Sequence, residues 1–491
     1  MQKHISLLYK DSAPETETVS EIKEAIYNLN IDRMAEGACK NKKCTDYFLS
    51  VLARPATSTE NIAYRAEILR DFIRYPDLLS SLVQLFKSYN NLSFETEEMT
   101  KEIFRYGMPA SVSGLMDCTY EELYINAHYA RNVIAYFSEI YELFAGYDVK
   151  SAGLLAIKDF CVQCNESKCI SAVENAAELF RSENPESYRF AVKTEFDAAM
   201  SAIRCTLADI EDVTAKEKKN ILSIFKKKDA IPSVWDIGSS AADSAATAVT
   251  YAIGDLSMLF SDIANGIYSV CYGLSEELQF YYTAIEIEKR IRALGMKYCF
   301  PQVFEKEADC LEACGIYDML LFNEGKRYES IVTNDVALTR KGIIAMGDNN
   351  CGKTSFLRAV GSAILFAQNG LFVCADSMNV SVRSGIFSHF SSEEKDFTDS
   401  SDAAGRFEGE VIDIARIVNA LTPYSLVLLN ETFQTTAFRE GALGMKEILD
   451  VFPEIKVKYI FVTHMKAIFP LFEEGEVTVL KADKYKLIEQ Q

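Results

Sequence analysis

Residues 347–355 read GDNNCGKTS and match the pattern GxxxxGK[ST]. In a loop of this kind the backbone N–H groups and the N-terminus of the next helix face phosphate groups. Lys353 is expected to reach the β- and γ-phosphates, and the Thr354 hydroxyl to bind Mg²⁺. The pattern predicts a nucleotide site formed by Gly347, Asn349, Asn350, Cys351, Gly352, Lys353, Thr354 and Ser355.

The elements on either side of this loop have the required order. The apolar run GIIAM at 342–346 is typical of a buried strand, and the apolar spacing of SFLRAVGSAILF at 355–366 is that of a helix. The alternative is a glycine turn before an ordinary helix. Glycine is needed at 352 in the nucleotide reading, because a side chain there would collide with the phosphate or the turn.

A second strand is predicted downstream at LVLLN, followed by Glu431. A carboxylate fixed at a strand end beside the γ-phosphate could polarise the attacking water, although a lone Glu there could also be solvated. Asn430 stands where an aspartate that holds the metal is usual. Its amide carries no formal charge, so we expect nucleotide binding to survive better than hydrolysis.

A third strand, YIFVT at 459–463, ends at His464, one of only four histidines in the chain. A histidine at a neighbouring strand tip can contact the γ-phosphate or its water. The alternative is a capping or packing role.

These motifs resemble, in order, the ATPase domain of the DNA mismatch repair MutS family over residues 325–480. The likeness includes TND at 333–335, Asn349 of the glycine loop, AQNGLFVCA at 367–375, and Thr463 with His464. It implies that Gln368 senses the metal and γ-phosphate, and that Glu431 and His464 are catalytic. It also implies ATP and Mg²⁺ as ligands, with Thr354 and Asn430 near the metal.

The chain departs from the family pattern in two further places. Phe407 and Glu410 match the family's signature segment, but Gly405 stands where its serine reaches the partner's nucleotide. After Glu431, the residues Phe433, Gln434 and Thr435 replace glycine, arginine and glycine. These departures indicate a divergent MutS-like protein.

The 491 residues predict a multidomain chain, with an all-α lever or core domain followed by an α/β P-loop NTPase domain of the ABC-like MutS kind. We expect the helical domain at 1–300, with a reduced clamp at about 190–270, and the ATPase domain at 301–491. One helix is predicted by an apolar stripe at Leu123, Ala127, Ala130, Ile134, Phe137, Tyr141 and Phe144.

Segments 60–72 and 280–295 resemble the start and the last helix of the MutS lever. No room is expected ahead of the lever for the family's mismatch-recognition and connector domains. The usual Phe-x-Glu wedge is not expected either.

The charge balance gives no general attraction to DNA, since 71 acidic and 51 basic residues leave a net charge of −20. DNA contact would have to be local. The best candidate is the lysine cluster, defined as Lys216, Lys218, Lys219, Lys226, Lys227 and Lys228. The alternative for the lysine cluster is a solvated helix face.

The thirteen cysteines show no regular pairing and no signal peptide opens the sequence, so a cytoplasmic location is expected. Cys161, Cys164 and Cys169 superficially resemble a zinc motif. Without a second CxxC or a nearby histidine, ordinary helix cysteines are the better interpretation. Three aspartates interrupt the weakly polar stretch at 239–272, so no membrane span is expected.

The resemblance implies an ATP-driven clamp that works as a dimer, most simply a homodimer joined through the ATPase domains. DNA of a non-mismatch structure is the expected ligand. The alternatives are a protein-binding ATP switch without DNA contact, and a weakly hydrolysing pseudoenzyme suggested by Asn430.

Overall fold

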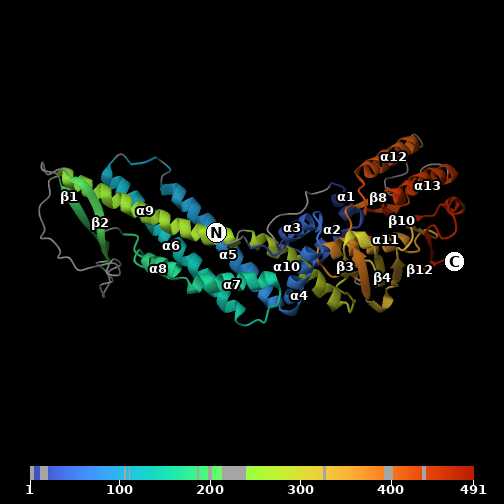
Figure 1. The fold of residues 1–491 in the computed structure, drawn as a ribbon, viewed down its shortest axis with the longest axis horizontal. Helices are drawn as coiled ribbons and strands as arrows, with labels where there is room; N and C mark the ends of the chain where they lie inside the picture. Colours follow the sequence, from blue (N-terminus) through green and yellow to red (C-terminus); the bar gives the residue numbers. More distant parts are fainter. Residues whose placement is uncertain are drawn as a thin grey trace. The chain divides into compact units, whose positions relative to one another are not determined.

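The computed structural model describes residues 5–10, 20–103, 105, 107–109, 111–184, 187–196, 202–212, 239–271, 273–323, 328–391, 402–433 and 438–490 (Figure 1). The chain forms two compact units. Unit 1 holds residues 1–5, 80–149 and 155–275, and unit 2 holds 6–79, 150–154 and 276–491. This division follows compactness and not family domains, so the boundary at residues 300 and 301 stays a prediction.

Unit 1 is built mainly from long helices. These are α5 (Pro76–Ile103), α6 (Val112–Phe144), α7 (Ala152–Glu166), α8 (Lys168–Ala177) and α9 (Ser239–Cys271). The first residues of α5 and of α7 belong to unit 2. Helices α6 and α9 pack side by side (Figure 1). The predicted stripe lies on α6 and its members are buried, except for Tyr141, which is 40% exposed.

The prediction of an all-α region before residue 301 is wrong in one place. Strands β1 (Tyr188–Phe196) and β2 (Ala202–Asp212) form a two-stranded antiparallel sheet in unit 1. The segment YRFAVKTEF alternates aromatic or aliphatic residues with charged or small ones, a period of two that suits a strand with one covered face. Tyr188 is buried and its ring lies 5.6 Å from that of Phe180.

The described residues of unit 2 form further helices outside its C-terminal α/β part. They are α1 (Ser20–Asn28), α2 (Ile31–Ala38), α3 (Lys42–Leu52), α4 (Thr59–Arg74) and α10 (Leu274–Ala293). Helix α4 begins where the Ser58 side chain accepts a hydrogen bond from the Asn61 N–H, and it ends just before Pro76. Residues of segments 60–72 and 280–295 therefore lie on α4 and α10.

The C-terminal part contains a six-stranded sheet in the order β12-β11-β6-β10-β9-β8. Its strands are β6 (Gly342–Met346), β8 (Ile386–Phe390), β9 (Leu426–Asn430), β10 (Lys458–Thr463), β11 (Thr478–Asp483) and β12 (Lys486–Glu489). All neighbours are parallel except β11 and β12. Strands β6, β9 and β10, which sequence analysis predicted, are neighbours and their carboxyl ends lie together.

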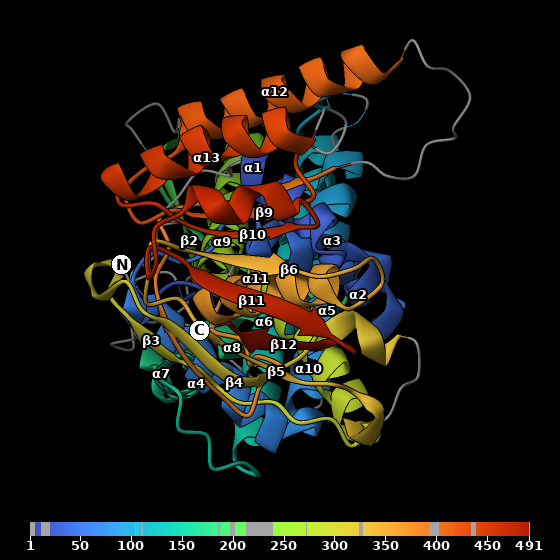
Figure 2. The same ribbon diagram turned by 90° about the vertical axis from the view of Figure 1, so that its right-hand side faces the viewer.

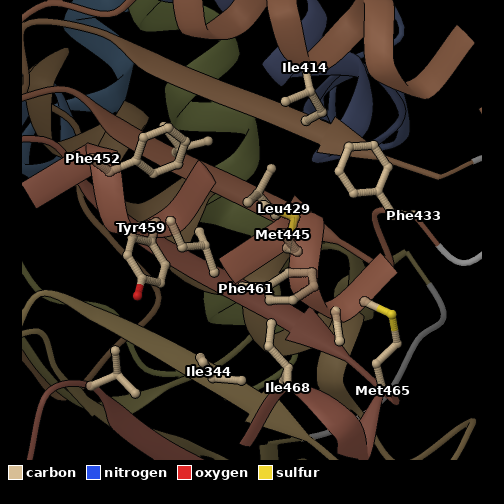
Figure 3. Packing of buried hydrophobic residues seen from close by; sticks show 14 of the residues in the cluster. Ile344, Ile414, Leu429, Phe433, Met445, Phe452, Tyr459, Phe461, Met465 and Ile468 are labelled. Carbon is tan, nitrogen blue, oxygen red and sulfur yellow. The ribbon is translucent and has the colours of Figure 1, made fainter. Parts of the chain in front are cut away.

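Helices cover both faces of this sheet, which explains why its central strands are continuously apolar. On one face, α12 (Asp402–Ala420) and α13 (Phe438–Glu454) pack on a core that includes Ile344, Leu429 and Phe461 (Figures 2 and 3). On the other face lies α11 (Lys353–Gln368), where a Cβ added to Gly361 would meet Leu428 at 2.6 Å.

A four-stranded sheet completes unit 2, in the order β3-β7-β4-β5. Its strands are β3 (Gln302–Phe304), β4 (Leu311–Ile316), β5 (Asn334–Ala337) and β7 (Ser377–Ser381). Short 3₁₀ helices lie at Lys306–Ala308, Met319–Phe322, Tyr328–Ser330 and Lys466–Leu471. The fold is therefore a helical part combined with an α/β part.

Two further expectations concern a membrane-spanning helix and a zinc motif. Within the described ranges, no helix is both long enough and apolar enough to cross a membrane. Cys161 and Cys164 are buried on α7 whereas Cys169 is exposed, and the described residues hold no group of three or more cysteine, histidine or acidic side chains placed to bind a metal.

Candidate functional site

The glycine loop joins β6 to α11 at the carboxyl edge of the parallel strands, where such sheets bind ligands. Gly352 has φ 92°, a left-handed conformation that a side chain would strain, and it immediately precedes the first residue of α11. A Cβ at this position would also lie 3.0 Å from the Tyr485 ring. The sequence pattern thus predicted the order strand, loop and helix, and the structure has that order.

The Lys353 side chain is only 5% exposed and lies beneath the loop. Its Nζ donates hydrogen bonds to the carbonyl oxygens of Gly347 at 3.0 Å and Asp348 at 2.9 Å. It also lies 3.6 Å from Oε1 of Glu431. These oxygen atoms hold the buried Lys353 ammonium at the glycine loop. An anion bound to the loop would therefore lie close to this positive charge.

The ends of β9 and β10 bring two other predicted residues to this cation. Oε2 of Glu431 accepts hydrogen bonds from the His464 backbone N–H at 3.1 Å, and lies 2.9 Å from His464 Nδ1. The Glu431 side chain is 9% exposed, and its backbone N–H donates to the Val462 carbonyl on the neighbouring strand. Glu431 therefore joins Lys353, at the start of α11, and His464 into one contact cluster at the carboxyl ends of β6, β9 and β10.

Thr354 and Asn430 also meet. The Thr354 hydroxyl donates to Oδ1 of Asn430 at 3.0 Å. The pair offers a hydroxyl and an amide oxygen, the kind of hard oxygen ligands that Mg²⁺ takes in proteins, usually beside carboxylates and phosphates. The Glu431 carboxylate follows directly in the chain. The donor set fits Mg²⁺, with one formal charge fewer than an aspartate would give.

The loop after β9 is held in an uncommon backbone conformation. Glu431 has φ 54° and Phe433 has φ 64°, and each left-handed non-glycine residue costs roughly 1–2 kcal/mol. Between them, the Thr432 hydroxyl lies 2.9 Å from Nδ1 of His389. His389 is buried, and this burial lowers its pKa. Such strain persists only where surrounding contacts hold it.

Two adjoining cavities lie at the loop. One, of about 350 Å³, is lined by residues 350–355 and Tyr485. The other, of about 280 Å³, is lined among others by Val332, Asn334, Phe356 and Tyr485. Asn334 fixes the β11–β12 turn, because its amide donates to the Tyr485 carbonyl and its oxygen accepts from the Leu487 N–H. The first cavity suits phosphates, and the second offers apolar and amide groups to a nucleoside.

Gln368 lies away from this cluster. It is the last residue of α11, and fifteen residues of helix at about 1.5 Å each put it roughly 22 Å from Lys353. Its side chain is fully buried, and it exchanges hydrogen bonds with the backbone of Arg383 at 2.9 and 3.0 Å. The structure therefore assigns Gln368 packing contacts and does not bring it to the glycine loop.

The residues that match the family signature lie on α12. The Phe407 ring stands 5.5 Å from that of Phe433, and the Glu410 carboxylate accepts a hydrogen bond from the Phe433 N–H. Gly405 lies in the first part of the same helix. The lysine cluster, together with Gln434 and Thr435, falls outside the residues that the structure describes.

Three residues near the site were not predicted from the sequence: Tyr485, His389 and Thr432. Two short alternating strands around Lys484 and Tyr485 predict a hairpin, but no local pattern shows that its turn reaches Gly352. His389 and Thr432 are 43 positions apart and meet only because β8 and β9 are neighbours. A single sequence carries no signal for such a pairing.

A glycine loop between a buried parallel strand and a helix, with a lysine at the helix start, defines the P-loop class of α/β folds. Within this class, residues 343–487 match the family model for MutS domain V. This C-terminal region belongs to the MutS family, as a divergent member.

Individual relatives agree with this assignment. The DNA mismatch repair protein MutS of Dehalococcoides mccartyi is 29% identical over 150 residues, which is 29% of this chain and 17% of that protein. The DNA mismatch repair protein MSH3 of Pyricularia oryzae is 33% identical over 126 residues, 26% of this chain and 11% of that protein. For MutS of Caldanaerobacter subterraneus the identity is 26% over 186 residues, 36% of this chain and 21% of that protein. The chain thus matches only a minor part of each relative.

Proposed function

We propose that the chain is a MutS-like ATPase that binds ATP with Mg²⁺ and couples its hydrolysis to a DNA-binding clamp. The observation that carries this proposal is the contact cluster of Lys353, Glu431 and His464 beneath a glycine loop. In a buried setting, a lysine beside a phosphate site stabilises charge, and a held carboxylate can orient water.

Each residue has a role in this proposal. The N–H groups of residues 349–355 and the Lys353 ammonium hold the phosphates, while Thr354 and Asn430 hold Mg²⁺. The metal would neutralise charge on the β- and γ-phosphate oxygens. Glu431 polarises the attacking water, and His464 orients the Glu431 carboxylate through its contacts at 2.9 and 3.1 Å. The cavity at Asn334 and Tyr485 takes the nucleoside.

Hydrolysis is expected to be slow. Asn430 gives Mg²⁺ a neutral amide oxygen in place of a carboxylate, so the metal is held less firmly. Glu431 keeps its contacts with Lys353 and His464, so the water-orienting group is retained. These observations favour a slow enzyme over a pseudoenzyme.

The working assembly in this proposal is a homodimer joined through the ATPase domains. ATP on one subunit would be completed by the start of the signature segment of the other, at Gly405. Gly405 removes the hydroxyl at the expected contact position, so the partner's contribution would come from backbone groups at the helix start. Hydrolysis would release the two domains.

DNA is the proposed ligand because the relatives are mismatch repair proteins. The lysine cluster is the candidate contact. The second candidate function is a protein-binding ATP switch, which the net charge of −20 favours, since it gives no global attraction to phosphates. Charge reversal of the lysine cluster separates them. It should abolish DNA-stimulated hydrolysis in the first case and leave partner binding intact in the second.

The test is ATP turnover of the full chain, measured alone and with duplex, mismatched or branched DNA at two salt concentrations. Lys353→Ala should abolish nucleotide binding, whereas Glu431→Ala should retain binding and trap the closed dimer. Turnover that is unchanged in both variants would refute the site assignment. Hydrolysis that no DNA stimulates at low salt would favour the protein-binding switch.

A further inference from the structure

The loop that presents Glu431 needs a hold from outside itself. Glu431 and Phe433 both have left-handed backbone conformations, at φ 54° and 64°, on either side of Thr432. Side chains other than glycine rarely adopt this region unless neighbouring contacts impose it. If the hold were released, the backbone would relax and the Glu431 carboxylate would move from Lys353 and His464.

Helix α12 provides such a hold through Glu410, which is 8% exposed. One oxygen of its carboxylate accepts the Phe433 N–H at 2.9 Å, and the other accepts the Ser391 hydroxyl at 2.6 Å. Ser391 directly follows β8 and its own N–H donates to the Asn430 carbonyl. A single buried carboxylate therefore ties α12 to both sides of the strand end that carries Glu431.

The same helix holds the Phe433 side chain. Phe407 lies one turn before Glu410, and its ring packs against Phe433 at a centroid distance of 5.5 Å. Phe433 is 4% exposed and belongs to the core cluster that includes Ile414 of α12 (Figure 3). Phe433 is thus fixed at its backbone by Glu410 and at its ring by Phe407 and the core.

We propose that Glu410 and Phe407 act as a clamp within the subunit, distinct from the DNA-binding clamp, by which α12 keeps Glu431 in its hydrolytic position. The left-handed backbone conformation of Phe433 makes this clamp necessary. Glu410 touches neither nucleotide nor water in this account, so it is a positioning residue. The proposal rests on the proposed ATPase function and adds its control. The position of α12 sets the rate of hydrolysis and leaves nucleotide binding unchanged.

The test compares kcat for ATP hydrolysis with the Kd for Mg-ATP in full-length variants. Glu410→Ala should lower kcat at least tenfold and change the Kd less than twofold, because the phosphate-binding loop is not touched. Glu410→Gln keeps one acceptor and should fall between the wild type and Glu410→Ala. Glu447→Ala, which removes an exposed carboxylate on α13 outside the signature segment, is the matched control and should change neither quantity.

A double-mutant cycle tests the cause. A glycine at position 433 can adopt the left-handed conformation without the contact from Glu410. The double variant Phe433→Gly, Glu410→Ala should therefore have a kcat less than threefold below that of Phe433→Gly alone. Should the glycine variant fail to fold, Ser391→Ala replaces it and should lower kcat two- to fivefold by loosening the carboxylate. Hydrogen exchange at the Phe433 amide should accelerate in Glu410→Ala.

The two proposals fail in different ways. A wild-type chain that neither binds nor hydrolyses Mg-ATP overturns the proposed function, and the clamp with it. A wild-type chain that hydrolyses ATP, together with a Glu410→Ala variant of unchanged kcat and unchanged exchange at Phe433, overturns the clamp alone. A loss of kcat that is matched by an equal rise in Kd also overturns it, since that result means general damage to the site.

Discussion

The two ends of α11 carry polar side chains in very different situations. At the start, Lys353 and Thr354 lie beside a cavity and contact Glu431 and Asn430. At the end, Gln368 and Asn369 are fully buried, and bond to Arg383 and Arg65. Both ends matched family segments in the sequence, yet the start borders a cavity that can take a ligand, whereas the polar side chains at the end bond to protein groups.

This contrast shows that polar residues at the two ends of one helix can serve different purposes, ligand binding at one end and stability of the fold at the other. A buried amide whose bonds all go to protein groups stabilises a junction, and its removal leaves those groups unpaired. A buried cation beside an open cavity can exchange its present partners for an anion. We therefore expect changes at the two ends of α11 to separate stability from nucleotide affinity.

The largest expected effect is on stability. Gln368→Leu leaves the N–H and carbonyl of Arg383 without their partner, so we expect a loss of roughly 2–4 kcal/mol in the free energy of unfolding. Urea denaturation measures this loss. Calorimetric titration should show that Gln368→Leu binds Mg-ATP with the affinity of the wild type. Lys353→Ala should show no binding of Mg-ATP. An affinity that falls with Gln368→Leu in a folded protein would return Gln368 to the nucleotide site.

A smaller effect is expected at the metal pair. Asn430→Asp keeps the acceptor for Thr354 and adds a formal charge, so the Mg²⁺ concentration for half-maximal hydrolysis should fall about tenfold, equivalent to about 1.4 kcal/mol. Asn379→Asp, on an exposed position of β7, is the matched control. An unchanged Mg²⁺ requirement in Asn430→Asp would place the metal elsewhere.

The smallest effect concerns pH. Burial lowers the pKa of His389, and Arg416 lowers it further, whereas Glu410 and Asp413 oppose the shift. As the pH falls, His389 is therefore protonated in the unfolded chain at a higher pH than in the folded chain. The contribution of His389 to stability is complete above its ordinary pKa of about 6.5, and it is lost as pH falls below that value.

A variant isolates this contribution. Between pH 7.5 and 5.5, wild type should lose more stability than His389→Gln, by less than the roughly 1.4 kcal/mol per pH unit that one proton allows. Urea denaturation at three pH values measures the difference. Identical pH profiles would mean that His389 does not titrate differently in the folded protein.

Much of the site follows from local sequence patterns. The spacing GxxxxGK[ST] and the apolar runs before Asn430 and His464 predicted three strands and the residues at their ends. Because parallel strands share one carboxyl edge, these residues were also expected to converge. Gln368 shows the limit of a family resemblance, since its place on α11 follows from helix length alone.

The remaining features depend on tertiary contacts. Glu410 and Phe433 lie 23 positions apart, and their bond requires a particular placement of α12 on the sheet. The β1–β2 pair was not predicted, because the segments around it have the apolar spacing of helices. The alternation of residue types that indicates a strand extends over only a few residues there. Such contacts arise from packing between elements, and no spacing within one element encodes them.

The central claim is that the glycine loop and Lys353 bind a triphosphate. The most direct test is a crystal structure of the full chain with Mg²⁺ and a non-hydrolysable ATP analogue at millimolar concentration. We expect the triphosphate against residues 349–354, with Lys353 Nζ turned from the carbonyl oxygens of Gly347 and Asp348 to a phosphate oxygen. A loop that stays empty, or a nucleotide bound elsewhere, would contradict the account.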